Sequence, residues 1–202
     1  MKLPSEEECM QYFEEYKVPR NILAHCKQTR NVAVFLAKQL IQKGIILNLE
    51  LIDRASLLHD LFKVVDIDNL VENKGHSYVA SEEEIKMWKH LKEIYSGMHE
   101  DEVFEKIFAK DFPELAQLIT ESGGLEHFGK SYSAKLVHYA DARVLRDEIV
   151  TRKEREEYLF ERYPERKEII LKENLGLDDD EKEMFFHLDF KPEELAERMK
   201  NG

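Results

Sequence analysis

The chain has 202 residues, of which 43% are hydrophobic and 36% charged, and its formal net charge is −12. This length allows a substantial core in one domain, while the acidic charge argues against broad nucleic-acid binding. No apolar run approaches the roughly 18 residues of a membrane span. Two cysteines give no disulfide framework, so we expect a reducing, cytoplasmic setting.

The N-terminal third predicts three helices. They are expected at residues 4–16, 19–44 and 49–62. Ser5 and Glu8 have capping-box spacing ahead of the first helix. Pro19 suits the first turn of the second helix and Gly44 its end, while Asn48 can cap the third.

The middle of the chain predicts three or four further helices. Two or three are expected within residues 82–97 and 98–122, and another at 132–149. Pro113 interrupts the 98–122 stretch. The segment 63–81 lacks periodicity, and irregular segments of this length are commonly functional. With few glycines and prolines and no β-branched alternation, the chain is predicted to be all-α.

The last fifty residues differ in composition from the rest. About half of them are charged, and their apolar residues form small clusters such as "YLF" and "MFFHLDF". We expect residues 1–150 to form the main helical domain, and residues 151–202 to add two to four peripheral helices that pack on it or on a partner. A solvated surface explains the charge better than an interaction tail. The apolar clusters leave a homodimer open.

Four ionisable residues fall on the apolar sides of three predicted helices. His25 lies on the stripe of the second helix, His59 and Asp60 close the third, and Asp141 follows Val137 by one turn. Burying carboxylates beside imidazoles requires compensation. A divalent metal compensates by neutralising the carboxylates and accepting the imidazole lone pairs.

The order of these motifs resembles the HD-domain superfamily of metal-dependent phosphohydrolases. The resemblance runs from about Val18 to Val144. Its fragments are "VPRNILAHCKQTRNVAVFLA", "ASLLHDLFK", "HEDEVFEKI" with "FPELAQLI", and "LVHYADARV". Each fragment alone is a weak signal, but four in the right order, each on the right kind of helix, are a strong one.

The resemblance implies a helical bundle of HD-domain type with one divalent metal. The ligands would be His25, His59, Asp60 and Asp141. Mn²⁺, Fe²⁺, Co²⁺, Ni²⁺ or Zn²⁺ suits two histidines better than Mg²⁺ does. The implied activity is hydrolysis of a small phosphorylated metabolite, with a nucleotide as the favoured substrate, through metal-activated water. Four ligands do not distinguish a monoester from a diester or an anhydride.

Some members of the superfamily bind a second metal through additional histidines. His99 stands where the first of these would lie, but "LITESGG" offers Thr120 and Glu121 and no histidine for the second. We therefore expect one metal, with His99 contacting a ligand residue or the substrate. A rescue by Glu121 or His127 ranks lower.

Several neighbours are candidates for catalysis or phosphate binding. Lys63, one turn after Asp60, can contact phosphate or orient Asp60, or can simply favour a helix end. Asp66 can act on the attacking water, although a turn-forming role is more common. Arg30 and Arg143 can clamp phosphate oxygens, with surface salt bridges as their alternative.

Two other functions compete with hydrolysis. One is a non-catalytic module that binds a nucleotide or protein and keeps a structural metal; the unassigned general base leaves it open. The other is an RNA-associated HD domain, which the charge of −12 disfavours. A segment at 63–78 that closes over a nucleotide, using Asn73, Lys74 or Tyr78, is a hypothesis from position alone.

Overall fold

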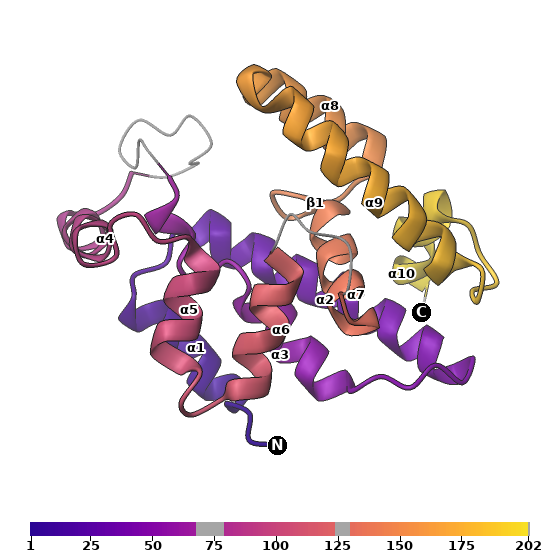
Figure 1. Cartoon of the computed structure of the whole chain (residues 1–202), viewed down its shortest axis with the longest axis horizontal. Helices are drawn as coiled ribbons and strands as arrows, with labels where there is room; N and C mark the ends of the chain where they lie inside the picture. Colours follow the sequence, from indigo (N-terminus) through magenta and orange to yellow (C-terminus); the bar gives the residue numbers. More distant parts are fainter. Residues whose placement is uncertain (68–78, 124–129, 202) are drawn as a thin grey trace.

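The computed structural model describes residues 1–67, 79–123 and 130–201. Helices dominate these ranges, which confirms the all-α prediction (Figure 1). The helices are α1 (Glu6–Glu15), α2 (Arg20–Gln42), α3 (Leu49–Leu58), α4 (Glu82–Ile94), α5 (Glu100–Phe108), α6 (Pro113–Gly123), α7 (Tyr132–Ala142), α8 (Arg152–Arg162), α9 (Lys167–Phe185) and α10 (Leu195–Asn201). The described residues also form short 3-10 turns, which are η1 (Lys63–Val65), η2 (Pro164–Arg166) and η3 (Pro192–Glu194). They also form two strands, β1 (Val144–Leu145) and β2 (Glu148–Ile149).

The long helix α2 is the centre of the bundle. It packs against α3 and α7, and α6 in turn packs against α3 and α7. Leu36 and Leu40 of α2, Leu57 of α3 and Leu136 of α7 are fully buried in one shared core. Each such side chain stabilises the fold by about 2 kcal/mol through removal from water. The segments that carry the four candidate ligands are therefore held by a continuous apolar core.

The starts of α1 and α3 and the end of α2 follow the local sequence signals. The Ser5 hydroxyl accepts a hydrogen bond from the Glu8 backbone N–H at 3.1 Å, and the Glu8 carboxylate accepts one from the Ser5 N–H at 2.7 Å. Asn48 caps α3, and Gly44 follows α2 with a φ of 89°, a conformation that favours glycine. Pro19 stands at the N-cap of α2, one residue before the first turn.

The third helix is shorter than predicted. It ends at Leu58 instead of at residue 62, and the next turns are closed by bonds from the Leu61 N–H to the Leu58 carbonyl and from the Lys63 N–H to the Asp60 carbonyl. Leu61 and Phe62 follow the buried Leu58 by three and four residues, so the apolar spacing alone continues past the observed end of the helix. Outside the helix, both side chains are buried, and the chain turns at His59 and Asp60.

The helix predicted over 132–149 is also shorter than expected. It ends at Ala142, and β1 pairs with β2 in an antiparallel hairpin turned by Arg146 and Asp147. Val144 and Ile149 are directly paired, and β-branched residues fit an extended, half-buried backbone better than a helix. Arg146 adopts a left-handed φ of 62° in this turn.

The C-terminal residues form a helical hairpin and a short final helix. Figure 1 shows α8 and α9 running side by side, and α9 also packs against α7. Leu177 and Met184 of α9 and Leu195 of α10 are buried in the shared core, whereas α8 buries no residue fully. Within the described ranges, none of the helices combines the length and the apolar character needed to cross a bilayer.

Candidate metal centre

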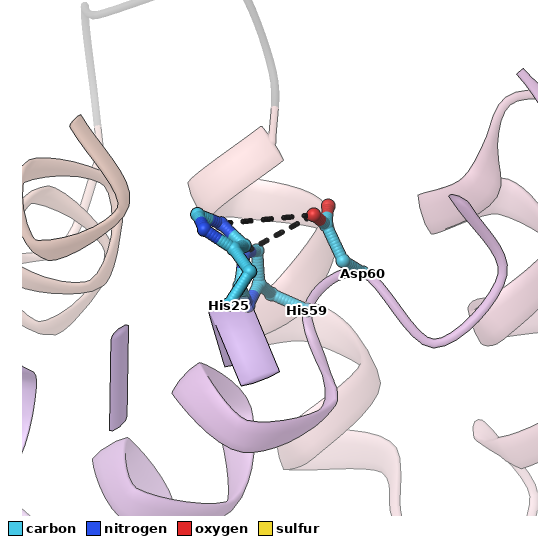
Figure 2. A group of neighbouring side chains, drawn as sticks. All are labelled: His25, His59 and Asp60. Atoms are coloured by element: carbon cyan, nitrogen blue, oxygen red, sulfur yellow. Dashed lines mark ion pairs between the residues drawn. The ribbon is translucent and has the colours of Figure 1, made fainter. Parts of the chain in front are cut away.

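Three segments bring the four predicted ligands together. His25 comes from α2, His59 and Asp60 from the turn after α3, and Asp141 from the end of α7. His25 Nε2 lies 2.8 Å from Asp141 Oδ1 and 3.8 Å from Asp60 Oδ2. His59 Nε2 lies 3.7 Å from each of the same two oxygens. Figure 2 shows both imidazoles turned toward the Asp60 carboxylate.

Backbone carbonyls fix the tautomers of both histidines. His25 Nδ1 lies 3.1 Å from the Arg146 carbonyl oxygen, and His59 Nδ1 lies 2.9 Å from the Ser56 carbonyl oxygen. A carbonyl only accepts, so each Nδ1 carries a hydrogen and donates it. In the neutral ring, the Nε2 lone pair then faces the carboxylates, which is the arrangement of metal-bound histidines. The hairpin after α7 thus supports a ligand on α2.

The spacing and chemistry of these atoms fit one divalent cation. Ligand atoms of His25, His59 and Asp60 lie within 4.8 Å of one another. Ligands at about 2.1 Å from a metal are about 3.0 Å apart at right angles and about 3.4 Å apart in a tetrahedron. The four distances between imidazole nitrogens and carboxylate oxygens, 2.8 to 3.8 Å, bracket these values. His59 Nε2 is buried and has no hydrogen-bond partner among the described residues.

The electrostatics keep both carboxylates ionised. Burial opposes ionisation of Asp60, but Lys63 and the two imidazoles lower its pKa to about 2. Burial also opposes ionisation of Asp141, yet hydrogen bonding to the imidazoles holds the pKa of that carboxyl well below its usual range. Burial disfavours the imidazolium of His59, but the Asp60 charge raises the pKa of His59 well above its ordinary value. The centre is therefore a site of negative potential suited to a cation.

Lys63 extends the centre on the side of Asp60. Its ammonium lies 3.4 Å from Asp60 Oδ1 and 2.5 Å from Glu100 Oε1. Burial raises the pKa of Glu100 to about 8. Sequence reasoning missed Glu100, because the first turn of α5 carries three consecutive acids and acids at helix N-termini are ordinary. Lys63 therefore contacts Asp60, as expected for a residue one turn later in the chain.

His99 and Asp66 form a separate pair beside this group. His99 Nδ1 lies 3.6 Å from Asp66 Oδ1, and the His99 side chain is 81% exposed. Asp66 Oδ2 accepts a long hydrogen bond from the Glu100 N–H at 3.4 Å. Glu121 bonds to Gln117 and Ser131, so it has partners outside the four-residue centre.

Two sequence predictions fall on residues that the structure leaves out. His127, a candidate for a second metal, lies outside the described residues, as do positions 68–78 of the suggested closing segment. Nothing in the described ranges bears on either prediction.

The two arginines predicted to bind phosphate hold other partners. Arg30 donates to Asp53 at 2.6 Å and to Glu6 at 2.7 Å. Arg143 is only 2% exposed, and its guanidinium donates to the Tyr139 hydroxyl and to the carbonyls of Val150 and Pro192. The alternative of a surface salt bridge was wrong for Arg143, because its donors are used inside the fold to fasten α7 to the C-terminal segment.

A different arginine lies at the centre. Arg155 of α8 places Nη2 3.9 Å from Asp141 Oδ1. Sequence reasoning missed it because "TRKEREEYLFER" is so densely charged that no single cation stands out.

A cavity of about 250 Å³ lies away from the four ligands. It is bordered by α8, α9 and η3, and its lining includes Arg152, Asp178 and Glu181. Arg152 is paired with Asp178 at 2.5 Å, so part of the wall is an internal ion pair. We assign the candidate chemistry to the four-residue centre instead, because only there do imidazole lone pairs and carboxylates converge within the described chain.

Comparisons with protein-family models, with curated proteins and with solved structures gave no significant match to this chain.

Proposed function

We propose that this chain is a metal-dependent phosphohydrolase of the HD-domain type. Its substrate would be a small phosphorylated metabolite, and we favour a nucleotide. One observation carries the proposal: two imidazole Nε2 atoms and two carboxylates converge from α2, α7 and the turn after α3. Each imidazole is held by a backbone carbonyl in the tautomer that a metal requires.

The donor set selects the kind of metal. Two imidazoles favour Mn²⁺, Fe²⁺, Co²⁺, Ni²⁺ or Zn²⁺ over Mg²⁺, which prefers an all-oxygen shell. Such an ion lowers the pKa of a bound water toward neutrality and polarises a phosphoryl oxygen. The ion would be held by His25, His59, Asp60 and Asp141.

The remaining residues have positioning roles in this proposal. Lys63 holds Asp60 through a 3.4 Å contact while Glu100 holds Lys63, so the carboxylate orientation is set from two sides. The ammonium is also a candidate contact for substrate phosphate. Asp66 and His99 remain candidates for handling the proton of the attacking water, because their pair adjoins Glu100.

Elemental analysis coupled to a phosphate-release screen tests the function. The purified protein is stripped of metal, reloaded with each candidate ion, and assayed on nucleoside mono-, di- and triphosphates. We expect about one ion per chain and turnover that depends on it. Asp60→Asn, which keeps the side-chain volume, should lose the bound ion and the turnover. Asp179 is an exposed carboxylate on α9, so Asp179→Asn should keep the bound ion and the turnover.

The outcomes separate the candidate functions. A fully active Asp60→Asn variant that retains its metal would refute the proposed centre. A wild-type protein that binds metal in this site but turns over none of the phosphate esters would instead favour the non-catalytic binding module.

A further inference from the structure

Arg155 belongs to the C-terminal extension but lies at the rim of the metal centre. It sits on α8, and its guanidinium approaches Asp141, a proposed ligand on α7, at 3.9 Å. Its side chain is 20% exposed, so it is largely enclosed yet open to solvent on one side. Fourteen residues separate the two positions in sequence, and the hairpin of β1 and β2 makes the return possible.

The donors of Arg155 are mostly uncommitted. A guanidinium carries five N–H groups in a planar fork, and a 3.9 Å separation is too long for a hydrogen bond. Asp141 is its sole charged partner within 4.0 Å among the described residues. By contrast, Arg30 and Arg143 make short hydrogen bonds to carboxylates, a hydroxyl or carbonyls.

Arg155 carries a positive charge that has no balancing negative charge in the proposed centre. A divalent ion would be balanced by the carboxylates of Asp60 and Asp141. Lys63 already has a close partner in Glu100, which it contacts at 2.5 Å. Arg155 therefore adds a positive charge that the centre does not itself compensate, beside an ion of the same sign. Such a group is stabilised when an anion bridges it and the metal.

We propose that Arg155 binds the non-bridging phosphoryl oxygens of the substrate, so that α8 of the C-terminal extension completes the site. This inference rests on the proposed hydrolase function and names the substrate-binding residue that the N-terminal motifs do not contain. The planar fork of arginine matches two phosphoryl oxygens at once, which a lysine ammonium does not.

Binding of inorganic phosphate, measured by calorimetry with and without Co²⁺, tests the assignment. The variants are Arg155→Ala and Arg155→Lys. The matched control is Lys153→Ala, which removes the same charge from the same helix at a side chain 81% exposed. We expect Arg155→Ala to keep its metal content and to bind phosphate about 10-fold to 100-fold more weakly. Arg155→Lys should be intermediate, and the control should match the wild type.

Three results would overturn the inference. Unchanged phosphate affinity in Arg155→Ala would show that the guanidinium does not touch the anion. Loss of metal from Arg155→Ala with unaltered phosphate affinity in the remaining metal-loaded fraction would show that it only holds Asp141. A wild type that takes up no metal would refute the hydrolase, while the phosphate difference between wild type and Arg155→Ala would still decide the role of Arg155. Absence of phosphate binding by the wild type in both conditions would also overturn it.

Discussion

His59→Ala is the most direct perturbation of the proposed metal centre. Its imidazole is oriented by a hydrogen bond to the Ser56 carbonyl at 2.9 Å, and its buried Nε2 has no hydrogen-bond partner among the described residues. Removing it deletes one of the four proposed ligands and leaves the other three in place. Four-ligand zinc sites in small domains bind with about 10 to 16 kcal/mol. Divided equally among four ligands, this binding free energy is about 2.5 to 4 kcal/mol per ligand. Loss of one ligand should therefore weaken metal affinity roughly 10²-fold to 10³-fold.

Competition with a chelator of known affinity measures this loss. Wild type, His59→Ala and His90→Ala are titrated with Co²⁺ under identical conditions, and circular dichroism verifies that each variant keeps its helical content. His90 is an exposed residue of α4, so its removal controls for the loss of a histidine as such. The expected order is wild type equal to His90→Ala, with His59→Ala far weaker. A His59→Ala affinity within about threefold of wild type would place the metal elsewhere, because so small a change is below 1 kcal/mol.

Three further outcomes follow from the described residues. Because Asp60 raises the pKa of His59, the metal-free ring holds a proton that the metal must displace, so Co²⁺ affinity should rise about tenfold per pH unit below that pKa in titrations at several pH values. Burial raises the pKa of Cys9 to about 12, so it should react with a thiol reagent only after denaturation. Arg143→Ala removes three buried hydrogen bonds and should lower the free energy of unfolding by about 3 kcal/mol in urea titrations.

Local periodicity predicted much of the centre. An apolar stripe on a helix identifies which face is buried, and His25 and Asp141 share such faces. His25 is buried as this face predicts, whereas the Asp141 side chain is 32% exposed. The order of the motifs supplied what periodicity lacks, namely that these three faces meet one another. The 2.8 Å contact between His25 and Asp141 across 116 residues agrees with that expectation.

The supporting residues could not be predicted in the same way. The turn at His59 was taken for helix because the apolar spacing continues through Leu61 and Phe62, and spacing alone does not show where a helix ends. Glu100 lies in a run of acidic residues, and Arg155 lies among residues of alternating charge. Neither could be singled out from its neighbours as a functional residue. The contact of the Arg146 carbonyl with His25 is made by the backbone, so the type of side chain at position 146 could not predict it.

The contacts across residue 150 bear on how the extension and the centre depend on each other. The domain boundary expected there remains a prediction, but the chain on either side is joined by more than the backbone. Arg143 donates to the Pro192 carbonyl, and the Tyr139 hydroxyl donates to Glu181 at 2.6 Å. These bonds fix the end of α7, which carries Asp141, while α8 returns Arg155 to the same carboxylate. Because one helix end is both a proposed ligand position and an anchoring point, displacement of the C-terminal helices would disturb the proposed metal centre as well as the surface.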